Sequence, residues 1–114
     1  MNSYTLFFRM DIITPEAQPS QQQMELYMRQ WTDWTEGIEV NGQLIGGTHL
    51  AKQGIVLKPK GIMESGAYSH QNDSIAGYIV ILAKNINDAA AIAQACPILN
   101  GEGTSVEIRQ CIGV

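Results

Sequence analysis

The chain has 114 residues, a formal net charge of −4 and a sequence pI of about 4.9. This length is sufficient for one domain with one core, and it is too short for separate catalytic and regulatory domains. Its seven Lys and Arg residues are scattered, so the clustered positive charge that nucleic-acid binding requires is missing and this class of partner is disfavoured.

Apolar segments and cysteines limit the class of protein further. The amino terminus, MNSYTLFFRMD, lacks a basic flank, and no segment approaches about 18 uninterrupted apolar residues. Cys96 and Cys111 have no metal-ligand spacing and are too few for a disulfide scaffold. We therefore expect a cytoplasmic protein with reduced thiols and no membrane association.

The first predicted element is a strand over residues 4–10, YTLFFRM. Its residues alternate between two faces, with Tyr4, Leu6, Phe8 and Met10 on one and Thr5, Phe7 and Arg9 on the other. The next element is a helix, because Ser20 and Gln23 match the reciprocal S-x-x-Q capping pattern. Its apolar side chains, from Met24 through Trp31 to Ile38, recur at helical spacing.

Glycines punctuate the middle of the chain. Residues 43–50, QLIGGTHL, are predicted to connect the helix to the sheet. Residues 55–58, IVLK, form a short strand closed by Pro59, and residues 61–63 belong to the return arm of a hairpin. This arm leads into residues 77–84, GYIVILAK, which are apolar at consecutive positions and predict a central strand covered on both faces.

A second helix and a last strand complete the chain. Asn85 can cap a helix over residues 86–96 that Pro97 ends, and residues 104–112, TSVEIRQCI, alternate as a strand does. The order strand, helix, hairpin, central strand, helix, strand predicts an α+β fold. We expect a ferredoxin-like βαββαβ sandwich, with two helices on one side of an antiparallel sheet.

The predicted sheet has more apolar surface than two helices can cover. Both helices lie on one face, yet Phe7 and the doubly apolar central strand require a cover on the other. A second copy of the chain can provide it. Two sheets stacked face to face give a dimeric α+β barrel, with a small-molecule pocket between or beside the sheets.

Several segments resemble the YCII-related proteins, specifically the branch named for its D-G-P-F motif. They are GAYSHQNDSIAGYIVI, NINDAAAIAQACP, VEIRQ, the tryptophan-containing helix and GQLIGGTHL. The resemblance covers nearly the whole chain and implies one YCII-related domain over residues 1–114. It also implies a ferredoxin-like sandwich that dimerises through its sheets, and it implies no particular reaction.

The chain departs from the pattern of this family in three places. The D-G-P-F motif falls on residues 65–68, SGAY, where only the glycine is kept. The E-x-K-E that usually follows is replaced by a segment with His70, Asn72 and Asp73. The R-x-x-H of members with a proposed histidine and aspartate pair is missing from the first helix, so that assignment does not transfer.

His70 and Asp73 are the candidate catalytic residues. They lie three apart, and an aspartate that orients an imidazole makes it a general base near neutral pH. The alternative is that Asn72 and Asp73 shape a turn while His70 points to water. The residues alone leave both interpretations open.

Five other residues are candidate ligand contacts. Ser65 and Tyr68 come from the motif segment, and His49 follows a pair of glycines, so it faces a pocket or ends a strand. Arg9 and Arg109 lie on strand faces where charge is unexpected. They either pair with Glu107 across adjacent strands or bind an anionic ligand.

Two functions of different class follow. In one, the homodimer performs acid/base chemistry of the isomerase or lyase type without a cofactor, with His70 or His49 and Asp73 as acid or base. In the other, it is a ligand-binding or regulatory module without turnover. No metal is expected, because only a convergence of His49, His70 and Asp73 in space would supply ligands.

Overall fold

The computed structural model describes residues 1–113 as an α+β fold. Its main sheet consists of β1 (Asn2–Asp11), β2 (Leu44–His49), β5 (Asp73–Ala83) and β6 (Ser105–Gln110). These strands lie in the order β2-β5-β1-β6, and each neighbouring pair is antiparallel. The strands β3 (Ile55–Lys58) and β4 (Ile62–Ser65) form a separate antiparallel hairpin.

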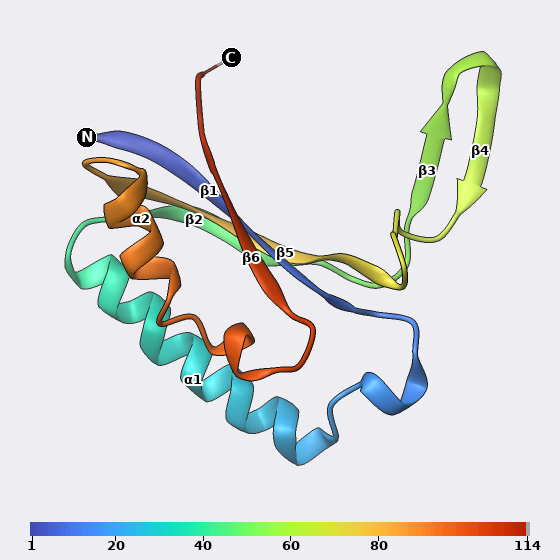
Figure 1. Ribbon diagram of the computed structural model, residues 1–114, viewed down its shortest axis with the longest axis horizontal. Helices are drawn as coiled ribbons and strands as arrows, with labels where there is room; N and C mark the ends of the chain where they lie inside the picture. The colour runs from blue at the N-terminus through green and yellow to red at the C-terminus, as the bar shows by residue number, and fades with distance from the viewer. Residues whose placement is uncertain (114) are drawn as a thin grey trace.

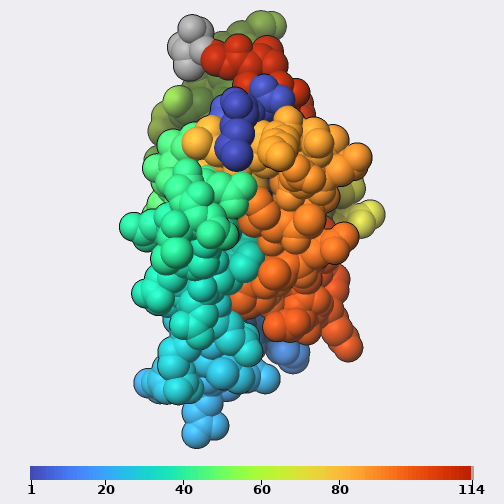
Figure 2. All heavy atoms as spheres, turned by 90° about the vertical axis from the view of Figure 1, so that its left-hand side faces the viewer, coloured from blue at the N-terminus to red at the C-terminus, as the bar shows by residue number. Residues whose placement is uncertain are grey.

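Both helices, α1 (Gln21–Val40) and α2 (Ile86–Ala93), lie on one side of the main sheet (Figure 1). Figure 2 shows α1 packed beside the segment that contains α2 and the short 3-10 turn Pro97–Asn100. The predicted α+β class, with two helices and an antiparallel sheet, is confirmed, and the strand order is consistent with a ferredoxin-like class. Within residues 1–113, neither helix combines the length and the apolar composition needed to cross a bilayer.

Both helices begin at the residues that the sequence predicts. The Gln23 amide donates to Ser20 Oγ at 3.1 Å, and the Ser20 amide donates to Gln23 Oε1 at 2.8 Å, which completes the capping box of α1. At α2, the Asp88 amide donates to Asn85 Oδ1 at 2.9 Å. Each cap satisfies amides that have no partner in the first turn of a helix.

The core lies between the helices and one face of the sheet. The side chains of Tyr4, Leu6 and Phe8 on β1 are buried there, as the alternation of this strand predicts. The other buried core residues are Ile79, Ile81 and Ala83 on β5, Trp31 and Ile38 on α1, Ala89 and Ala93 on α2, and Cys96 and Ile98 after α2. The two fully buried residues of α2 are alanines, whose small side chains allow it to approach the sheet closely.

Within residues 1–113, no helix lies against the other face of the main sheet (Figure 1). We call it the open face; its apolar members, all half-buried, are Phe7, Ile75, Tyr78, Val80 and Leu82. Phe7 pairs with Tyr78 on the neighbouring strand, so two aromatic residues lie side by side near its centre. The strand β5 therefore lies inside the sheet, as the sequence predicts, and the helices of this chain cover one of its two faces.

The assignment of residues 43–50 as a connection is wrong, because Leu44–His49 form the edge strand β2. Gly46 and Gly47 weaken the strand propensity of this segment, so its sequence pattern did not indicate a strand. Gly47 has φ 148°, and a Cβ there would lie 2.3 Å from the Tyr78 carbonyl oxygen. A register shift between Leu44 and Gly46 accompanies this close approach. The hairpin predicted to follow does form, outside the main sheet.

The contrast between the two adjacent glycines gives a first prediction. Gly47→Ala should lower the free energy of unfolding by at least about 2 kcal/mol, because the added Cβ meets the β5 backbone. Gly46→Ala, where the Cβ meets nothing within 4 Å, should change stability by less than about 1 kcal/mol. Urea denaturation of both variants measures the difference, and equal losses would contradict the proposed close approach.

Candidate functional site

A cleft of about 280 Å³ lies between α1 and β2, on the helix side of the sheet. It is lined by Trp31 and Thr35 from α1, by Leu44, Gly46, Gly47, Thr48 and His49 from β2, and by Ile79 from β5. None of these lining residues is Asp, Glu, Lys or Arg. The cleft therefore combines apolar walls with the hydroxyl group of Thr35 and one imidazole, which is the usual composition of a small-molecule site.

The position of His49 is fixed by a glycine on the neighbouring strand. Gly77 on β5 pairs with His49 on one side and with Phe8 on the other. A Cβ at Gly77 would lie 2.9 Å from the Thr48 carbonyl oxygen, so only glycine allows β2 to come this close. His49, Gly77 and Phe8 therefore lie side by side on three neighbouring strands, on the face that the helices cover. His49 and Phe8 have side chains there, and Gly77 between them has none.

Trp31 contacts both residues that flank Gly77. The Trp31 and Phe8 rings meet edge-on with centroids 4.8 Å apart, and the Trp31 and His49 rings lie 4.5 Å apart. Tyr27 lies one helical turn before Trp31, and the Tyr27 and His49 rings meet edge-on with centroids 6.3 Å apart. The imidazole is thus held against an indole face and beside a phenol, while its outer side remains exposed.

This aromatic surrounding changes the proton affinity of the site. Burial lowers the pKa of His49 below its ordinary value of 6.5, because a charged imidazole is poorly solvated there. Burial, with a smaller contribution from Cys96, raises the pKa of Tyr27, so the phenol keeps its proton. His49 is therefore a neutral imidazole at neutral pH, able to accept a proton or a hydrogen bond.

The hydroxyl group of the cleft belongs to Thr35, whose Oγ1 donates to the Trp31 carbonyl at 3.0 Å. Thr48 pairs with Tyr78, so its side chain lies on the open face. The oxygen lone pairs of Thr35 and the neutral imidazole of His49 remain able to accept from a ligand. A bound molecule that carries a hydroxyl or amide donor would match these acceptors.

The backbone of His70 and Asp73 closes a tight turn. The His70 amide donates to the Asp73 carbonyl at 2.8 Å, and the Asp73 amide donates to the His70 carbonyl at 2.9 Å. Gln71 and Asn72 between them have φ of 53° and 68°, as a two-residue hairpin turn requires. Within residues 1–113, no hydrogen bond joins the two side chains, and Asp73 Oδ1 is buried without a partner.

Ser65 and Tyr68 also lie outside the cleft. Ser65 ends β4 and is exposed, and the Tyr68 side chain is 72% exposed. The Tyr68 carbonyl accepts a hydrogen bond from Ser74 Oγ at 2.5 Å, which holds the start of β5 to the segment before it. The backbone of Tyr68 therefore has a structural contact, whereas its ring faces solvent.

Arg9 and Arg109 lie on the open face, across the sheet from His49. Both contact Glu107, each with a nitrogen 3.6 Å from one carboxylate oxygen. The structural ion pair considered from the sequence thus forms between adjacent strands. Two arginines share one carboxylate, so this edge of the open face retains a positive charge.

The site residues that the sequence suggested consequently occupy three separate places. Among residues 1–113, no group of three or more His, Cys, Asp or Glu is arranged to hold a metal ion. Burial raises the pKa of the Cys96 thiol to about 11, which leaves it protonated and unreactive. The sequence identified His49 but assigned Trp31 to the core alone. The glycines at 46, 47 and 77 were the signal that could have located the cleft.

A scan of the sequence against protein-family models finds no match, and a search of curated proteins finds no relative.

The lowered pKa of His49 makes stability depend on pH. The unfolded state binds a proton below about 6.5 and the folded state resists it, so stability is complete above this pH and declines as the pH falls. Between about pH 7.5 and pH 5.5, the wild-type melting temperature should decrease, and His49→Gln should remove most of the decrease. His70→Gln, at an exposed position, should retain it. Calorimetry measures all three, and an unchanged slope in His49→Gln would contradict the assignment.

Proposed function

We propose that the protein is a homodimer with a ferredoxin-like βαββαβ fold that binds a small molecule in the cleft at His49. The observation that carries this proposal is the neutral imidazole held 4.5 Å from Trp31 in a cleft between α1 and β2. A cleft that joins an aromatic wall to a few directed polar groups is the default site for a small ligand.

The dimer in this proposal is formed by the open face. Phe7, Tyr78 and Val80 lie at the centre of a face without a helix, and their burial between two sheets removes apolar surface from water. The charged residues Arg9 and Glu107 lie towards one edge, as polar residues do at the rim of an interface. Two such sheets stacked about 10 Å apart would form a dimeric α+β barrel.

The strand order and the two helices on one face also support membership of the YCII-related family, in the D-G-P-F branch. The site in this chain would differ from that branch. Its D-G-P-F positions, residues 65–68, lie between β4 and β5, and the cleft uses Trp31 and His49 instead.

The volume and the polar groups of the cleft limit which ligands can bind in it. A ring of the size of benzene fits a volume of about 280 Å³ and can stack on Trp31. A hydroxyl group on that ring can donate to the neutral His49 or to Thr35. The ligand class is therefore a small planar molecule with one or two hydrogen-bond donors.

Acid/base catalysis is a second candidate function, favoured by the lowered pKa of His49. A neutral imidazole beside a bound carbonyl compound can remove a proton from the carbon next to the carbonyl. This places the base at His49, whereas the turn that contains His70 and Asp73 would have no chemical role.

Phenol is a suitable probe of the proposed site. It should bind with a dissociation constant of about 1 mM, given its few heavy atoms, and should shift the amide resonances of residues 46–49. His49→Leu should weaken binding about tenfold through the lost hydrogen bond, and His70→Leu should not. Shifts confined to residues 65–73, or equal affinity in His49→Leu, would contradict the location of the site.

Deuterium exchange separates catalysis from binding. If His49 acts as a base, wild-type protein should accelerate exchange of the protons beside the carbonyl of cyclohexanone in D2O. His49→Gln should reduce this acceleration by about 100-fold, and His70→Gln should leave it unchanged. Proton NMR follows the exchange. Phenol binding without any acceleration would leave the binding module as the function.

A further inference from the structure

The β3–β4 hairpin, which we call the arm (residues 54–66), has one apolar face that the rest of the chain leaves exposed. The strand register places Leu57 opposite Met63, and Ile55 lies on the same face. These three side chains are 72%, 64% and 65% exposed, respectively. The opposite face is more polar and includes the ion pair between Lys58 and Glu64.

The arm cannot bury this face against its own domain. It rises from the end of the sheet on the side opposite the helices (Figure 1). A bond of 2.7 Å from the Gly66 amide to the Gly54 carbonyl closes its base. A lone two-stranded hairpin is only marginally stable in water, so an arm that exposes Leu57 and Met63 needs a partner surface.

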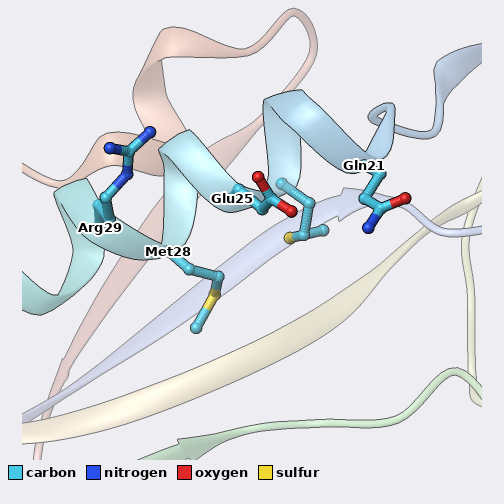
Figure 3. Close-up of a pocket in the computed structure, with 5 residues that line it drawn as sticks. Gln21, Glu25, Met28 and Arg29 are labelled. Carbon is cyan, nitrogen blue, oxygen red and sulfur yellow. The ribbon is translucent and has the colours of Figure 1, made fainter.

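A second exposed apolar surface lies on the first half of α1. We call it the methionine groove; it has a volume of about 680 Å³ and is lined by Gln21, Met24, Glu25, Met28 and Arg29. Met24 is 41% exposed and Met28 is 39% exposed. Figure 3 shows Met28 pointing from the helix towards the strands, while Arg29 points away from them. Flexible thioether side chains adapt well to an inserted apolar surface.

The arm is long enough to span the gap between two stacked sheets. Four residues per strand, at about 3.3 Å each, give an arm about 13 Å tall before its turn. Stacked sheets lie about 10 Å apart. An arm that rises from one sheet therefore passes the edge of the facing sheet by about 3 Å, in the direction of its helices.

The charges of the two surfaces are complementary. The tip of the arm carries Lys58 and Lys60; Glu64 pairs with Lys58, and the arm keeps a net positive charge. Besides Arg29, the charged residues of α1 are all acidic: Glu25, Asp33, Glu36 and Glu39. A basic tip that approaches an acidic helix is attracted to it, and two tips or two helices that approach each other are repelled.

We propose that each arm docks with its Leu57 and Met63 face in the methionine groove of a second copy of the chain. A two-fold axis makes this contact reciprocal, so one dimer buries two arms and fills two grooves. This proposal rests on the homodimer proposed above. It adds that the arm of each chain holds the two copies together.

Sedimentation equilibrium of two matched variants tests the arm. Leu57→Ser combined with Met63→Ser should raise the dissociation constant of the dimer at least about tenfold, because two contacts per dimer are lost. Ile62→Ser, on the opposite face and 51% exposed, should change it less than about threefold. A wild-type dimer with an unchanged constant in the double variant would overturn the arm alone. A monomeric wild-type chain would contradict both the arm and the homodimer.

A disulfide identifies the surface that receives the arm. In a Cys111→Ser background, a chain with both Leu57→Cys and Met28→Cys should form a covalent dimer under oxidising conditions, visible on a non-reducing gel. Chains with only one of these two cysteines should not form it. A covalent dimer from Leu57→Cys alone would place the arms against each other, and no covalent dimer from the double variant would exclude the methionine groove. Either result overturns the docking that we propose.

Discussion

The structure depends on a single constraint: two helices cover one face of a sheet whose inner strands are apolar on both. The covered face gives the core, where Leu6, Phe8 and Ile81 are almost completely buried. The open face keeps Phe7, Tyr78 and Val80 half-buried with no layer above them. Water solvates such a face poorly. The fold of one chain leaves this apolar surface without a cover, and a second chain can cover it.

On the covered face of the sheet, the same residues contribute to the core and to the wall of the cleft. Gly77 has no side chain, so Trp31 reaches Phe8 on one side of it and His49 on the other. The indole is therefore a core residue and a cleft wall at once. The same burial that anchors Trp31 lowers the pKa of His49, which links the stability of the fold to the protonation of its candidate site.

Local patterns in the sequence were sufficient for most elements. The alternation of residues 4–10, the capping box at Ser20 and the cap at Asn85 each act between near neighbours, and each is found as predicted. The edge strand β2 was missed because its glycines are used for contact with β5, which is distant in sequence. The sequence could name His49 as a candidate. Its contact with Trp31 could not be predicted, because this contact also joins residues that are distant in sequence. The turn at residues 70–73 is one of the two interpretations that the sequence left open.

Contact between two open faces can be detected directly. In a dimer mixed from carbon-13-labelled and unlabelled chains, an isotope-filtered nuclear Overhauser experiment records only signals that cross between copies. The account predicts such signals between the Val80 methyl groups and the rings of Phe7 and Tyr78. Their absence in a sample shown to be dimeric, or crossing signals only from the outer surfaces of α1 and α2, would contradict the packing of sheet on sheet.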